Sequence, residues 1–202
     1  MNQIARGPRG LGPPYNHNIT FPNHISRNRF MYKPLAMLLL AAVAIAGCGP
    51  RQTESDADDQ AKAVGEKYLI DQEPADAEPV GKAVQGNDDT EVTVVGRIGG
   101  ELEPMIDGLA AFTIVDPSLK ACSDIPDDPC KTPWDYCCED PDRLKTHSVM
   151  VKFTDEDGTV VPVDATKLFG VEPLQTVVIK GKLQKDESGK IAVVAKKMYV
   201  KK

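Results

Sequence analysis

Short segments in which apolar and polar residues alternate fill the second half of the chain, and this pattern limits the fold more than any other feature of the sequence. Alternation with a period of two places every second side chain on one face, which predicts β-strands with one buried side. β-Branched residues, which favour strands, are frequent in the same segments. The predicted strands cover residues 91–98, 109–115, 148–153, 176–183 and 191–200.

Turn and helix signals separate the third and fourth of these strands. Residues 155–158 (Asp-Glu-Asp-Gly) predict a turn, after which 159–163 is expected to return as a hairpin partner. Asp164 is expected to cap a short helix over 165–169, which Gly170 ends. Together these elements predict one domain of about 110 residues, enough for a single hydrophobic core.

This order of elements, with one helix between the third and fourth long strands, is the order of an OB-fold. The first strand contains Val94-Val95-Gly96-Arg97, and the fourth contains residues 178–183 (Val-Ile-Lys-Gly-Lys-Leu). In both, glycine lies inside a β-branched strand, where a closing barrel must bend. On these residues the chain from 91 to 200 resembles OB-fold domains of the tRNA anticodon-binding-like kind. The predicted fold class is mainly β, a small five- to six-stranded OB-like Greek-key barrel with one short helix; a β-sandwich is the alternative.

A cysteine-rich insertion separates the second and third predicted strands. It covers residues 116–146 and contains Cys122, Cys130, Cys137 and Cys138. An even number of cysteines in an oxidising compartment predicts disulfides. Two of the three possible connectivities join Cys122 and Cys130 to the adjacent pair, in either order. The third links the two neighbours and strains the peptide between them.

The same four cysteines allow a second hypothesis, a metal or redox site. Thiolates bind zinc and softer metals, and the nearby His147 could add a ligand. The Cys-x7-Cys-x6-Cys-Cys spacing lacks the Cys-x2-Cys pairs of common zinc modules, and adjacent cysteines rarely ligate one ion well. The Cys-x-x-Cys spacing of redox-active pairs is also absent. Structural disulfides are therefore the first prediction, and no cofactor is expected.

Two aromatic residues of the insertion, Trp134 and Tyr136, flank Asp135. Rings beside bridged cysteines are expected to pack over the sulfurs as a small core. Because the two rings are two positions apart, they could instead lie on one exposed edge and bind a partner. OB-folds bind through their loops and the adjoining strand face, so this insertion is the first place where a binding site is expected.

A 12-residue apolar run over 35–46 leads to a small residue and then Cys48. The run is shorter than the roughly 20 apolar residues that span a bilayer, but after Lys33 it fits the apolar region of an export signal. Its end, Ile45-Ala46-Gly47-Cys48, resembles the lipobox of bacterial lipoproteins. The resemblance implies cleavage before Cys48 and its acylation, which would anchor an exported protein to a membrane, facing the periplasm or the cell exterior. Residues 1–30 are expected to be a mis-annotated start or a long n-region.

Removing residues 1–47 makes the chain more acidic. It leaves 19 basic residues against 30 acidic ones, a net charge of −11, which argues against nucleic-acid binding. Residues 48–90, rich in Asp, Glu, Ala and Pro, predict an acidic tether with a short helix around 59–70. The predicted organisation is therefore a signal, this tether and an OB-like domain over 91–202.

Charge is uneven within the predicted domain. Residues 116–142 have a net charge of −6, whereas 180–202, with eight lysines, have +6. These segments could be solvated faces or could complement each other. Alternatively, the lysine-rich end could meet an anionic partner such as lipid headgroups or an envelope polymer.

No set of residues predicts catalysis. His147 is the only histidine after Cys48, and Ser148 beside it points to the opposite strand face. Phe112 and Phe153 are expected in the core, which leaves no row of aromatics on which bases could stack. The predicted function is a membrane-anchored, non-enzymatic binding or interaction module of the cell envelope, with an unknown envelope protein or polymer as partner. A metal or redox protein is the alternative, and nucleic acid is not an expected ligand.

Overall fold

The computed structural model describes residues 54–202, so the predicted signal and Cys48 lie outside the described residues. The longer strands are β2 (Glu91–Ile98), β3 (Ala111–Val115), β4 (Ser148–Phe153), β5 (Thr176–Lys185) and β6 (Ile191–Val200). The other elements are α1 (Glu54–Glu66), β1 (Glu78–Pro79), α2 (Val80–Ala83), the 3-10 turn η1 (Cys122–Asp124), α3 (Pro141–Thr146) and α4 (Ala165–Phe169). Within this part of the chain, no helix has the length and apolar character needed to cross a membrane.

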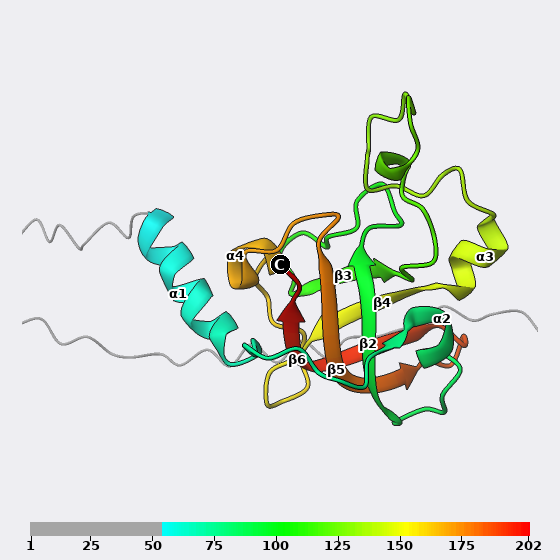
Figure 1. The fold of residues 1–202 in the computed structure, drawn as a ribbon. Coiled ribbons are helices and arrows are strands. Elements are labelled where there is room, and N and C mark those ends of the chain that lie inside the picture. Colours follow the sequence, from blue (N-terminus) through cyan, green and yellow to red (C-terminus); the bar gives the residue numbers. More distant parts are fainter. Residues whose placement is uncertain (1–53) are drawn as a thin grey trace, which may run out of the picture. The chain divides into compact units, whose positions relative to one another are not determined.

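The longer strands close into a five-stranded barrel (Figure 1). β2 pairs antiparallel with β3 and β5, β3 with β4, and β5 with β6, and a parallel pairing of β4 with β6 completes the circle. With α4 between β4 and β5, this is the connectivity of an OB-fold, and the predicted mainly-β OB-like barrel is confirmed. β2, β4 and β6 have the predicted bounds. β3 begins two residues later than predicted, at Ala111, and β5 continues two residues further, to Lys185.

Two glycines lie where neighbouring strands approach each other most closely. A Cβ on Gly96 would stand 2.9 Å from the Ile114 side chain. A Cβ on Gly181 would overlap the backbone carbonyl of Val194, next to a register shift between Lys180 and Gly181. Both positions therefore require glycine for barrel closure, which agrees with the expectation from their place inside β-branched strands.

The predicted hairpin partner over 159–163 does not form a strand. The turn at 155–158 is present, but only an isolated bridge joins Thr154 to Val160. Pro162 has no N–H with which to continue the pairing, and the chain then turns into α4.

The helix α4 forms where it was predicted, but one of its end signals acts differently. Gly170 ends the helix in the left-handed conformation, with φ 65°. Asp164 occupies the N-cap position, yet its side chain makes no capping hydrogen bond. Its carboxylate instead accepts a hydrogen bond from the Gly108 N–H, which fixes the loop before β3.

Much of the predicted tether over 48–90 belongs to the domain, which corrects that prediction for the described residues. The predicted helix is α1, which begins earlier and packs along α4. β1 pairs in parallel with β2, and backbone hydrogen bonds join Tyr68 and Ile70 to Met198 of β6. Val80 and Ala83 are buried in the main core. Apolar residues are sparse in this segment, but Tyr68, Val80 and Ala83 are buried. The average composition of a segment does not reveal whether its few apolar residues pack against a core.

Four aromatic rings meet at one end of the main core. The Phe153 ring centroid lies 4.5 Å from that of Phe169, 5.3 Å from that of Tyr68 and 6.0 Å from that of Phe112. The Tyr68 hydroxyl donates a 2.9 Å hydrogen bond to the Thr154 carbonyl. Phe112 and Phe153 are fully buried, so their predicted core role is confirmed.

Candidate functional site

The cysteine-rich insertion, which includes α3, rises from one end of the barrel between β3 and β4 and is tied to the barrel at its base (Figure 1). Gly100 N–H donates a 3.0 Å hydrogen bond to the Trp134 carbonyl. Arg97, near the end of β2, donates hydrogen bonds to the Asp124 carboxylate at 2.6 Å and to the Leu174 carbonyl at 3.1 Å. The Arg97 guanidinium holds the pKa of Asp124 below its ordinary value. Contacts with the barrel therefore help to order the insertion.

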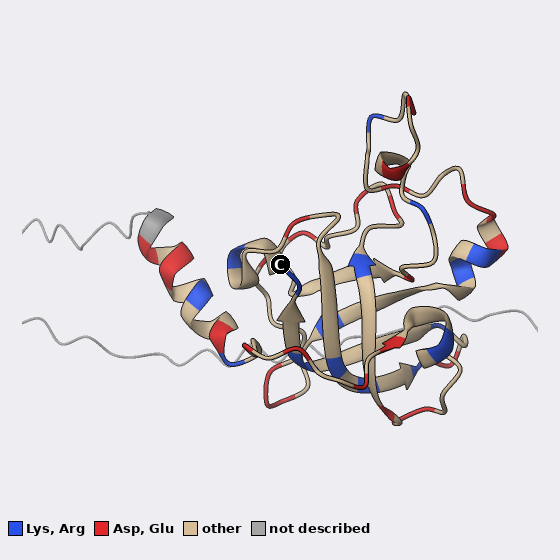
Figure 2. Ribbon diagram, viewed as in Figure 1, with Lys and Arg blue, Asp and Glu red and all other residues tan. Residues whose placement is uncertain are grey.

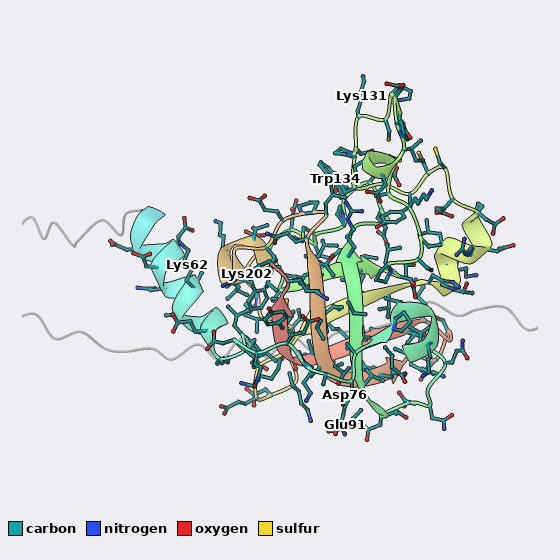
Figure 3. All side chains as sticks on the ribbon, viewed as in Figure 1. Lys62, Asp76, Glu91, Lys131, Trp134 and Lys202 are labelled. Carbon is teal, nitrogen blue, oxygen red and sulfur yellow. The ribbon has the colours of Figure 1, made fainter. Side chains whose placement is uncertain are left out.

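The two aromatic candidates of the insertion have separate roles. Tyr136 is 1% exposed and forms a second small core with Val115, Leu119 and Ala121. Burial raises the pKa of Tyr136 to about 12. Trp134 lies closer to the base of the insertion than Lys131 does (Figure 3), and it donates a 3.1 Å hydrogen bond to the Leu102 carbonyl. Tyr136 thus lies in a small core, but its partners there are aliphatic, and packing of the rings over the cysteine sulfurs stays a prediction. The burial of Tyr136 argues against two rings on one exposed edge.

Three cysteine sulfurs converge inside the insertion. Those of Cys122, Cys130 and Cys137 all lie within 4.8 Å of one another, and the Cys122 and Cys137 sulfurs are 3.4 Å apart. Cys138 belongs to a different group, with Cys122 and Asp128. Its sulfur lies 3.6 Å from an Asp128 carboxylate oxygen. The adjacent cysteines therefore contribute to two different groups of side chains.

The thiols have different surroundings. Cys122 is 2% exposed, and burial raises its pKa to about 12. Hydrogen bonds from the hydroxyl and backbone of Thr132 lower the pKa of Cys130, whose sulfur lies 3.3 Å from that hydroxyl. The 3.4 Å between the Cys122 and Cys137 sulfurs is longer than a disulfide bond of about 2.05 Å. Both predicted connectivities therefore stay predictions.

His147, the possible additional metal ligand, lies elsewhere. In residues 54–202, neither group of potential metal-ligating side chains includes it. Its Nδ1 lies 3.0 Å from both the Arg143 carbonyl oxygen and the Thr146 hydroxyl, within α3. Its ring covers Gly81, where a Cβ would stand 2.5 Å from the imidazole. His147 thus packs α3 against α2, and the hypothesis that it joins the thiols is corrected.

A buried carboxylate, that of Asp116, also holds α2 in place beside the insertion. Asp116 is 3% exposed and accepts hydrogen bonds from the N–H groups of Gly81, at 2.8 Å, and Ser118, at 2.9 Å. Burial opposes ionisation, but these hydrogen bonds, with the nearby His147, leave the pKa of Asp116 below its ordinary value. The ionised carboxylate therefore joins α2 to the start of the insertion.

Replacing Asp116 with Asn should lower the free energy of unfolding at pH 7 by about 2 kcal/mol, because an amide accepts from only one of the two N–H donors. The folded-state pKa of Asp116 is depressed, so its stabilising effect is present above the unfolded-state pKa and is lost as the pH falls toward the folded value. Urea unfolding of both proteins between pH 7 and pH 3 measures this. The difference should shrink on acidification, while the exposed Asp107→Asn control stays close to the parent; a difference that persists unchanged at low pH would contradict the assignment.

A groove of about 990 Å³ crosses the barrel face that β3 and β4 form. The β2–β3 loop contributes Glu101, β3 contributes Thr113, and the β5–β6 turn contributes residues 188–191. The remaining lining comes from α2 and the two residues after it, from the end of α3 and from the start of β4: Gly81, Val84, Gln85, Lys145, Thr146, His147, Ser148, Val149 and Met150. This is the face, flanked by the same loops, through which OB-folds bind extended ligands.

The groove has a mixed polar lining with an apolar contact. Met150 is 38% exposed, one of the large hydrophobic residues in the described chain that remain accessible. Lys145 and Lys190 supply positive charge, and Glu101 is the acidic residue of the lining. No Phe, Tyr or Trp lines it. Sequence analysis missed this site because its residues come from five separate segments, although an exposed methionine in an alternating strand was a usable signal.

Three of the eight lysines in residues 180–202 form ion pairs within the domain. Lys182 contacts Asp89 at 2.8 Å, and Lys201 contacts Glu73 at 2.7 Å. Lys196 contacts the Glu91 carboxylate at 3.3 Å. Figure 2 shows these basic and acidic positions intermixed along the strands and the segment that precedes β2. These three lysines therefore pair with acidic residues that precede β2 or lie at its start. The sequence had allowed a pairing with the acidic insertion instead, and these ion pairs do not involve it.

Comparison with known proteins adds little to this description. No family model and no curated protein matches the chain. One similar solved structure is described as that of the hypothetical protein ygiW from E. coli, at 16% sequence identity and a TM-score of 0.34. The match covers 66% of this chain and 96% of that one. A similarity at this level carries no functional argument, and the OB-like assignment depends on the strand pairing itself.

Proposed function

We propose that this chain is a non-enzymatic binding module of the cell envelope, anchored to a membrane through Cys48, and that its ligand occupies the groove on the β3–β4 face. The observation that carries the proposal is the position of this groove between Glu101, Met150 and the turn at 188–191. In an OB-fold, these elements flank the ligand. Anchoring and export are supported by the lipobox-like sequence that ends at Cys48.

An acidic polysaccharide is the ligand whose chemistry fits the groove best. The Ser148 hydroxyl can exchange hydrogen bonds with sugar hydroxyls, and Lys145 and Lys190 can pair with carboxylates. The exposed Met150 offers an apolar surface for a sugar ring. A nucleic acid fits less well because the lining has no aromatic side chain for base stacking.

The surroundings of His147 support a non-enzymatic role. Its Nδ1 is engaged by the Arg143 carbonyl and the Thr146 hydroxyl, and its ring lies against Gly81. A hydrolytic triad needs an imidazole between a carboxylate and a nucleophilic hydroxyl. Asp116 instead directs its carboxylate at the backbone N–H groups of Gly81 and Ser118.

The proposal predicts that the full chain binds polygalacturonate, an acidic polysaccharide, more tightly than dextran, a neutral one. Replacing Met150 with Asp or Lys190 with Glu should each weaken binding at least about tenfold, because the groove loses its apolar contact or gains a repulsive charge. Isothermal titration calorimetry with both polymers and with single-stranded DNA measures this.

Lys180→Glu is the matched control, since Lys180 is exposed on β5 and does not line the groove. It should change the affinity by less than about twofold. Equal loss in Lys180→Glu and Lys190→Glu would mean that binding depends on overall charge and would refute the groove. Tighter binding to single-stranded DNA than to either polysaccharide would favour the nucleic-acid alternative.

A further inference from the structure

The insertion brings three thiols, eight and seven residues apart in the sequence, to one point. Cys122 lies on η1, Cys130 follows Pro129 and Cys137 precedes α3. Their sulfurs lie within 4.8 Å of one another. A metal–sulfur bond is about 2.3 Å long, so three sulfurs on one ion lie about 4 Å apart. The Cys122 and Cys137 sulfurs are already closer than this, at 3.4 Å, and Cys130 needs at most a small approach.

We propose that Cys122, Cys130 and Cys137 bind one soft, thiophilic metal ion, with Cu⁺ and Zn²⁺ the ions of this class. Thiolates select such ions over the hard cations that carboxylates hold. This inference concerns the insertion and does not depend on the groove of the proposed function. It assigns a metal ion to cysteines that the sequence first predicted to form structural disulfides.

The position of Cys138 removes the main objection to a metal site. Adjacent cysteines rarely ligate one ion well, but here the pair is divided. Cys137 groups with Cys122 and Cys130. Cys138 also lies within 4.8 Å of the Cys122 sulfur, but its other partner is the Asp128 carboxylate at 3.6 Å, and it does not group with Cys130 or Cys137. One member of the pair can therefore bind the ion without the other.

Neighbouring groups hold two of the three ligands in place. Cys122 N–H donates a 2.8 Å hydrogen bond to the Asp135 carbonyl, and the Thr132 hydroxyl lies 3.3 Å from the Cys130 sulfur. Such outer partners orient ligands and tune metal sites. The net charge of −6 over residues 116–142 favours a cation in this segment.

The test uses the full chain, purified without oxygen, reduced and then freed of reductant. Co²⁺ serves as the spectroscopic probe for Zn²⁺, and Cu⁺ is titrated against a chromogenic chelator. We expect a single ion per chain and intense sulfur-to-cobalt charge-transfer bands. Loss of an outer partner alone weakens metal sites 10–100-fold, so Cys122→Ser, Cys130→Ser and Cys137→Ser should each cost at least about 100-fold in affinity.

The adjacent substitution Cys138→Ser is the matched control and should cost less than about tenfold, because Cys138 is outside the group of three. Circular dichroism checks that every variant retains the barrel. Equal losses for Cys137→Ser and Cys138→Ser in folded proteins would overturn the three-ligand site. Native protein with neither free thiols nor bound metal would also overturn it and would support the disulfides.

Discussion

Replacing Gly181 with alanine is expected to lower the free energy of unfolding by about 3 kcal/mol or more, which is a large part of the stability of a domain this size. A Cβ at this position would overlap the Val194 carbonyl and stand 2.9 Å from the Ala195 Cα. Both neighbours are backbone atoms of β6, so no side-chain rotation can relieve the overlap. Only a local opening of the β5–β6 pairing can make room.

Gly158→Ala provides the comparison for this result. Gly158 lies in the turn at 155–158 with φ +81°, and a Cβ there would meet no atom within 4 Å. Its substitution should cost about 1–2 kcal/mol from backbone conformation alone. Urea unfolding of the two variants separates conformational cost from steric overlap. If Gly181→Ala were no less stable than Gly158→Ala, close strand approach at Gly181 would not be what closes the barrel.

The barrel could be predicted from sequence because its signals are local. Alternating β-branched residues indicate strands, and a glycine inside such a strand, as at Gly96 and Gly181, indicates close approach. The predicted strand at 159–163 failed because apolar alternation was given more weight than Pro162, which removes a ladder donor. Tertiary contact also decided the role of Asp164, whose carboxylate fixes Gly108 and leaves the helix uncapped.

The candidate sites were less accessible to sequence reasoning because they combine distant segments. The four cysteines identified the insertion as unusual, but spacing alone did not show that Cys137 and Cys138 would join different groups. The groove depends on barrel closure, which brings Glu101, Met150 and Lys190 to one face. No local pattern encodes that juxtaposition.

Replacing Tyr68 with alanine should lower the free energy of unfolding by about 3–4 kcal/mol, although composition placed this residue in a tether. Tyr68 is 6% exposed, and its ring contacts Phe153 and Phe169. Removing it would open a cavity between these rings and break the hydrogen bond to Thr154. Tyr68→Phe keeps the ring and loses only the hydrogen bond, so it should cost about 1 kcal/mol.

The same reasoning predicts that a chain shortened to begin at residue 91 does not fold, because the barrel loses Tyr68, Val80 and Ala83 from its main core. Val64→Ala is the control within the same region, since Val64 on α1 is 43% exposed and should cost less than about 0.5 kcal/mol. Calorimetric melting of these variants measures both effects. A shortened chain that melts with the same midpoint as the parent would restore the tether interpretation, whereas its loss of cooperative melting would place the start of the folded domain before residue 91.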